Sequence, residues 1–173
     1  ADVHTYLRAG ADARTRATLT TNWRSDQALL EGCAALFGDA TLGHPDIPFR
    51  PVQAADPSRA PGLVGSHDDT PLRIRVVRTD SELITVTGTG FAQVGSARDL
   101  IARDVAAEAV RLLSSDATVR TGDGGSEPVH PGHVAVLVRT NNHAAMVREA
   151  LEAVGVPAVI NGAGSVFATR AAT

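Results

Sequence analysis

The apolar run at residues 133–138 (HVAVLV) constrains the fold of this chain more than any other stretch. A nearly continuous apolar run of this length is typical of a strand covered on both faces, as in a parallel sheet. Amphipathic spacing predicts a helix over 142–154, and a shorter apolar run predicts a strand at 158–160. Strand, helix and strand with short connections form a right-handed βαβ unit. The predicted fold class is therefore α/β.

Two further strands and two further helices are expected in the rest of the chain, separated by long loops. The strands are predicted at 17–21 and 72–78, and the helices at 26–37 and 97–113. The loops span 38–70, which is rich in Pro, Gly and Asp, and 114–132, which is polar and rich in Gly. Ser25 is the expected N-cap of the first helix. The length of 173 residues suits a single domain with one core.

Composition excludes several classes of function. The net charge of −3 argues against a stand-alone electrostatic DNA binder, which usually carries a basic patch. All 16 basic residues are Arg, so the chain holds no phosphate-binding Walker A lysine and no lysine nucleophile. The only cysteine, Cys33, allows no disulfide within the chain, which fits a reducing cytoplasm. The sequence has no apolar run of the roughly 18 residues that a membrane span needs.

The segment Asn22-Trp23-Arg24-Ser25 lies between a predicted strand and a predicted helix. That edge of an α/β sheet is where ligands bind. An aromatic ring there can stack on a base, and an arginine offers a planar fork for phosphate. The alternative is that Trp23 anchors the core and Arg24 forms a surface salt bridge.

A resemblance to a known family rests on two segments in the right order. Residues 19–25 resemble motif IV of UvrD-type superfamily 1 helicases, L-x-x-N-[YW]-R-S before an amphipathic helix. Residues 133–141, the helix that follows and residues 155–157 resemble the D-I-A-V-L-x-R-T-N … G-I-P pattern of the same family. Within it, the RecB-like subunits of exodeoxyribonuclease V have stretches similar to residues 2–7, 47–52 and 164–169.

The resemblance implies a fold and a set of site residues. The fold would be a RecA-like parallel sheet flanked by helices, a partial, truncated domain in which residues 1–173 belong to motor domain 2A. Arg24 would be the catalytic residue that reaches the γ-phosphate of ATP, and Trp23 would stack on adenine. Asn22 is counted with this ATP-binding set, and Asn22 and Ser25 would shape the turn. The DNA-binding residues would be Arg139, Thr140 and Asn141, which would face single-stranded DNA.

The resemblance also implies a parent enzyme, an ATP-dependent DNA helicase and exodeoxyribonuclease for double-strand break processing. Its cofactors would be ATP and Mg²⁺, and its partners DNA and RecC-like and RecD-like subunits. The chain lacks the Walker A and Walker B motifs and motifs V and VI, so this stretch alone is expected to bind no cofactor and to be inactive. Both ends are expected to be cuts, because the chain begins at Ala1 instead of Met and stops where a further helix is expected to begin.

Two other functions stay open at this point. One is a helicase-like scaffold or interaction module that has lost its ATPase activity. The other is an independent nucleotide-binding α/β domain, although Gly88, Gly90 and Gly95 match a dinucleotide fingerprint poorly. The histidines show no typical metal-ligand spacing, and the pair His130 and His133 falls at a loop–strand junction, so no metal site is predicted.

Overall fold

The computed structural model describes residues 3–68 and 70–161, so the stretch 164–169 and Asp2 lie outside the described residues. The chain forms two compact units. The first comprises residues 1–64 and 68–74, and the second 65–67 and 75–173. The first unit holds α1 (Val3–Asp12), β1 (Thr21–Asn22), α2 (Gln27–Phe37), β2 (Gln53–Ala54), the 3-10 turn η1 (Asp56–Ser58) and β3 (Leu63–Val64). The second holds α3 (Val94–Leu113), β4 (Thr118–Arg120), β5 (Ser126–Pro128), η2 (Pro131–His133) and α4 (Asn141–Ala153).

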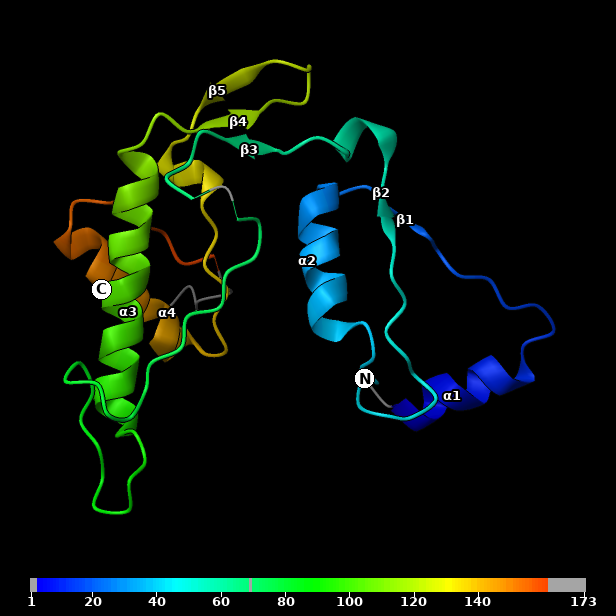
Figure 1. The fold of residues 1–173 in the computed structure, drawn as a ribbon, viewed down its shortest axis with the longest axis horizontal. Helices are drawn as coiled ribbons and strands as arrows, with labels where there is room; N and C mark the ends of the chain where they lie inside the picture. The colour runs from blue at the N-terminus through cyan, green and yellow to red at the C-terminus, as the bar shows by residue number, and fades with distance from the viewer. Residues whose placement is uncertain (1–2, 69, 162–173) are drawn as a thin grey trace, which may run out of the picture. The chain divides into compact units, whose positions relative to one another are not determined.

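The first unit is organised around a short parallel pair of strands. Thr21 pairs with Gln53, and Asn22 pairs with Ala54. Parallel strands need a crossover connection, and α2 supplies it here and packs beside β2 (Figure 1). The α/β prediction is therefore confirmed, with the parallel pair in the first unit. The strand expected at 17–21 is shorter and lies later in the chain.

The helix α2 is capped one residue later than the sequence suggests. Asp26 has an extended backbone, and its Oδ1 accepts a hydrogen bond from the backbone N–H of Leu29 at 2.9 Å. This is the geometry of an N-cap. The prediction of Ser25 as N-cap is wrong, because the Ser25 backbone belongs to the preceding turn.

The second unit is held together by the contact between α3 and α4 (Figure 1). The buried residues of the core cluster between these helices are small on α3 and larger on α4: Ala102, Ala106, Ala109, Val147 and Leu151. The three alanines follow the i, i+4, i+7 spacing of one helix face, so the backbone of α3 can come close to α4.

The apolar spacing of these helices also predicts Ile101 and Val154 inside, and both predictions are wrong. The Ile101 side chain is 58% exposed and that of Val154 is 49% exposed. Ile101 lies one residue before the buried alanine row, which turns it about 100° away on a helix of 3.6 residues per turn. Val154 is the C-cap of α4, where the helix has already ended.

Three expected strands do not form among the described residues. The segments at 72–78, 133–138 and 158–160 belong to none of the strands of the described part, and His133 is the last residue of the η2 turn. Leu137 is 96% exposed and Val159 is 94% exposed. A strand requires a neighbour that pairs with its backbone N–H and C=O groups. A RecA-like sheet is therefore not confirmed.

Residues 118–128 form a β-hairpin inside the segment 114–132, which the sequence predicts to be a loop. The strands β4 and β5 pair antiparallel, with Val119 opposite Glu127. The turn passes through Gly124, whose φ of 87° lies in the left-handed region that glycine adopts without strain. The Asp123 carboxylate accepts hydrogen bonds from the Thr121 hydroxyl and from the Gly125 backbone N–H, and these bonds lower its pKa below the ordinary value. The β4–β5 pairing therefore fixes the position of Glu127 opposite Val119.

No helix in the described ranges has both the length and the apolar character needed to cross a membrane.

From the α3–α4 contact we predict how a core substitution changes the free energy of unfolding. Leu151→Ala should lower the free energy of unfolding of the second unit by about 2–5 kcal/mol, because it removes a buried side chain and leaves a cavity. Ile101→Ala is the control, since it shortens an exposed side chain on the same pair of helices; we expect a change below about 1 kcal/mol. Urea unfolding followed by circular dichroism measures both, and equal effects would contradict the assigned core.

Candidate functional site

The turn after β1 is built by the side chain of Asn22. Its Oδ1 accepts hydrogen bonds from the backbone N–H of Arg24 at 2.8 Å and from that of Ser25 at 2.9 Å. An asparagine that bonds its own backbone two residues on stabilises a turn without any partner from elsewhere. The expectation that Asn22 shapes this turn is confirmed.

Two neighbouring side chains tie the start of α2 to other parts of the first unit. Gln27 Oε1 accepts a hydrogen bond from the backbone N–H of Ala54 in β2 at 3.0 Å. Asp26 Oδ2 accepts one from the backbone N–H of Gly62 at 3.3 Å. Sequence reasoning missed both contacts, because a polar residue at a helix start signals a cap and does not reveal a partner some 27 or 36 positions away. The start of α2, directly after the turn, is therefore attached to β2 and to Gly62.

This turn displays Trp23 and Arg24 to solvent. Trp23 is 73% exposed, so it does not anchor a core within the described part of the chain. Arg24 is exposed as well, and among the described residues its guanidinium has no hydrogen-bond or ion-pair partner. An aromatic face beside an unpaired cation can stack on a base and bind a phosphate. Both alternatives raised by the sequence, a core tryptophan and an arginine salt bridge, fail for the described residues.

The second predicted segment lies at the N-terminal end of α4, in the other unit. Thr140 is the N-cap, and its Oγ1 accepts a hydrogen bond from the backbone N–H of His143 at 3.3 Å. Arg139 precedes the helix, and Asn141 is its first residue; both are exposed. The structure therefore presents the three residues at one helix end.

A groove of about 810 Å³ in the second unit runs past this helix end. Its walls are α4, the end of α3, the η2 turn and the two segments at 134–139 and 156–161. Arg139 and Asn141 line it, together with Arg148 from the same helix. Sequence reasoning missed Arg148. Arg148 lies seven residues after Asn141, so the two residues share one face of the helix. This spacing could have indicated Arg148 from the sequence.

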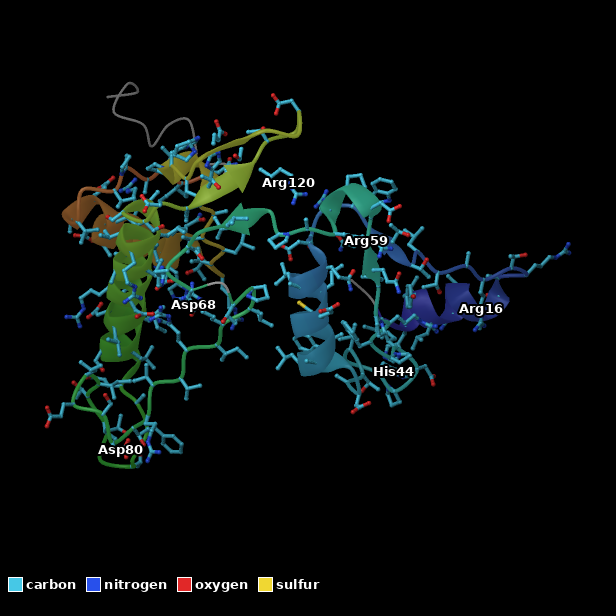
Figure 2. The ribbon with its side chains drawn as sticks, turned by 45° about the horizontal axis from the view of Figure 1, so that its top comes forward. Arg16, His44, Arg59, Asp68, Asp80 and Arg120 are labelled. Atoms are coloured by element: carbon cyan, nitrogen blue, oxygen red, sulfur yellow. The ribbon has the colours of Figure 1, made fainter. Side chains whose placement is uncertain are left out.

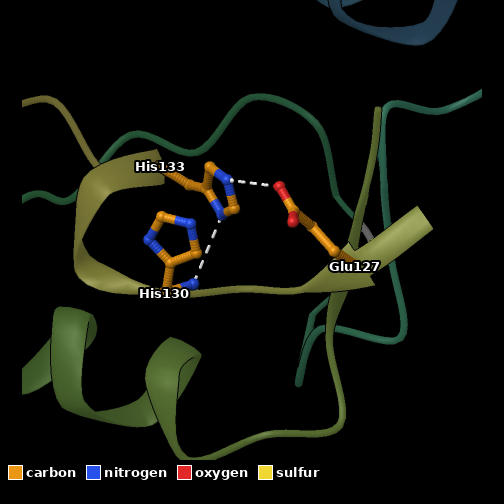
Figure 3. Close-up of side chains that lie close together, drawn as sticks. All are labelled: Glu127, His130 and His133. Carbon is orange, nitrogen blue, oxygen red and sulfur yellow. Dashed lines mark hydrogen bonds and ion pairs between the residues drawn. The ribbon is translucent and has the colours of Figure 1, made fainter. Parts of the chain in front are cut away.

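One cluster has the side chains of a metal site, although the sequence predicts none. Glu127, His130 and His133 each offer a ligand atom, and these atoms all lie within 4.8 Å of one another (Figure 3). The His133 side chain is 23% exposed and that of Glu127 is 48% exposed, so the cluster can be reached from solvent.

The curated relatives of the chain all carry the same protein name. No family model matches the chain. A curated relative from Mycobacterium tuberculosis, named RecBCD enzyme subunit RecB, is 37% identical over 171 residues, which is 99% of the chain and 15% of that protein. The RecB subunit from Mycolicibacterium smegmatis is 39% identical over 171 residues, with the same coverage. The one from Escherichia coli is 30% identical over 175 residues, which is 98% of the chain and 14% of that protein.

The chain spans about 15% of the length of the curated relatives that it matches, while nearly all of it takes part in the match. The resemblance inferred from the motifs is thereby confirmed. The chain is homologous to one segment of the RecB subunit of the RecBCD enzyme.

Proposed function

We propose that the chain is part of the second motor domain of an ATP-dependent DNA helicase and nuclease of the RecB type. In this proposal it supplies one side of an ATP site and part of a single-stranded DNA track. The observation that carries the proposal is the exposed Trp23–Arg24 pair on a turn that Asn22 organises. Asn22 fixes the backbone that carries both residues, and among the described residues the Arg24 guanidinium has no partner, so it is available to a ligand that arrives from outside.

Arg24 provides the charge for the phosphate end of the nucleotide. A guanidinium stays protonated and can form two parallel hydrogen bonds to phosphate oxygens. When ATP is cleaved, negative charge builds up on the transferred phosphoryl group, and an arginine that faces it stabilises the transition state. The Asn22 turn holds the Arg24 backbone in place, so little ordering is needed when ATP binds.

Trp23 provides the face for the base. An indole ring has a large apolar surface, and a ring that is 73% exposed can be covered by adenine without any rearrangement of a core. The chain contains no lysine, so the lysine that cradles the phosphates must lie in another part of the parent protein. The same holds for the groups that bind Mg²⁺, since the turn itself carries no carboxylate at positions 22–25.

Arg139, Thr140 and Asn141 form the proposed contact to single-stranded DNA. The first backbone N–H groups of α4 lie here, and the positive end of a helix dipole favours phosphate. The Thr140 hydroxyl accepts the capping bond with its oxygen and keeps its own proton for donation. Arg148 adds a second guanidinium along the groove, although it also lies 3.6 Å from Glu152. Contacts of this kind need little sequence preference.

The parent protein would act with RecC-like and RecD-like subunits on duplex ends during double-strand break processing, in the cytoplasm. ATP binding between this domain and one that carries the Walker motifs would draw the two together. ATP would bind the closed state more tightly than the open state. The resulting shift toward the closed state would move the domain along one DNA strand.

Arg24→Ala in the full-length parent protein should lower the turnover of ATP by about 10³-fold, because it removes charge stabilisation in the transition state. ATP affinity should change much less. The matched control is Arg16→Ala, an exposed arginine in the connection between α1 and β1 (Figure 2), which should leave turnover unchanged. DNA-stimulated ATPase assays and equilibrium nucleotide binding provide the two measurements. Normal turnover in Arg24→Ala would favour an ATPase-inactive scaffold.

Asn141→Ala should weaken the binding of single-stranded DNA by about 1 kcal/mol, or roughly fivefold, through the loss of one hydrogen bond. The neighbouring substitution Asn142→Ala is the control, since it removes the same side chain at an adjacent helix position that does not line the groove. Fluorescence anisotropy with an unstructured oligonucleotide measures the affinity of each variant. Equal affinities for the two variants would rule out a specific contact by Asn141.

A further inference from the structure

The Glu127–His130–His133 cluster is assembled by the hairpin and the turn that follows it. Glu127 lies on β5, and the two histidines flank η2, His130 as its N-cap and His133 as its last residue (Figure 3). The ring centroids of the histidines are 3.6 Å apart. His133 Nε2 lies 3.2 Å from Glu127 Oε1.

We propose that these three side chains bind a divalent transition-metal ion of the Zn²⁺ type. Two imidazole nitrogens and one carboxylate oxygen are ligands that Zn²⁺ accepts. Mg²⁺ and Ca²⁺ prefer oxygen ligands throughout, so two histidines select against them. Three protein ligands leave the fourth tetrahedral position for water, and the cluster's access to solvent fits such an open site. This proposal does not depend on the ATP or DNA roles assigned above.

Backbone hydrogen bonds orient both rings. His130 Nδ1 accepts from the backbone N–H of Gly132 at 3.1 Å, and His133 Nδ1 accepts from the backbone N–H of His130 at 3.3 Å. Because Nδ1 of each ring faces the backbone, Nε2 is the nitrogen left for an external ligand. Without metal, a neutral ring whose Nδ1 accepts such a bond carries its proton on Nε2, and His133 Nε2 lies 3.2 Å from Glu127 Oε1.

Binding of the ion therefore involves a defined exchange of protons. The ion takes the lone pair of each Nε2, the proton of each ring moves through solvent to Nδ1, and the two backbone contacts are lost. A tetrahedral Zn²⁺ site holds its ligand atoms roughly 3.3 Å apart, closer than the 4.8 Å limit observed here. Glu127, at 48% exposure, has the freedom to close this distance. We expect an affinity lower than that of closed structural sites, in which the ligands are fully preorganised.

The ion would join the β5 strand to the turn from which the 134–139 segment departs. That segment ends at Arg139, next to Thr140, the N-cap of α4. In the described part of the chain it has no strand partner, so a metal link at its start would restrict its motion. Zn²⁺ would then stabilise the second unit by binding its folded state alone.

The experiment is a titration of the full 173-residue chain with Zn²⁺ by isothermal calorimetry, with Co²⁺ absorption as a spectroscopic report of tetrahedral coordination. We expect one ion per chain, and no heat of binding with Mg²⁺. His133→Ala and Glu127→Gln should each weaken Zn²⁺ binding by about tenfold or more. His143→Ala is the matched control, a histidine of the same unit that lies outside the cluster, and it should bind as the unchanged chain does.

Circular dichroism of each variant without metal separates loss of a ligand from loss of the fold. If His133→Ala proves unfolded, Glu127→Gln decides, because it keeps the size of the side chain and lies at an exposed position. The proposal is overturned if the double variant His130→Ala/His133→Ala binds Zn²⁺ as tightly as the unchanged chain. It is also overturned if His143→Ala weakens binding as much as His133→Ala does.

Discussion

Backbone pairing is the constraint on which the rest of this structure depends. Every buried N–H and C=O group needs a partner, and an extended segment becomes a strand only where a neighbour supplies one. Thr21 and Asn22 meet this condition because β2 returns alongside them after α2. Leu137 and Val159 do not meet it among the described residues, and they remain exposed and outside any strand although their sequence is that of a buried strand.

In the second unit, the packing of α3 against α4 forms the hydrophobic core. Alanines at 102, 106 and 109 bury little area each, so most of the apolar stabilisation falls to Val147 and Leu151 on the facing helix. Small residues on one side and larger ones on the other allow close approach of the two backbones. This contact also fixes the helix whose N-terminal end carries Thr140 and Asn141. The proposed DNA contact therefore lies at the end of a helix that this core cluster holds in place.

The two kinds of site in this protein differ in how they are positioned. Asn22 builds its turn from hydrogen bonds to residues two and three positions on, so the display of Trp23 and Arg24 is largely a local property. Asp26 and Gln27 then attach that turn to Gly62 and Ala54. The Glu127–His130–His133 cluster arises differently, since the β4–β5 register and the η2 turn bring together side chains whose spacing suggests no shared role.

The sequence by itself determined the α/β class, the approximate positions of α2, α3 and α4, the turn at Asn22 and the kinship with RecB. These features rest on local patterns, because helix periodicity, capping and motif spacing are set by neighbours along the chain. Tertiary structure alone decided that Ile101 faces solvent, that Gln27 binds β2, and that Glu127 meets two histidines. It also decided that the apolar run at 133–138 stays unpaired in the described part. Strand formation and side-chain convergence depend on partners distant in sequence, and no local pattern specifies which partner is present.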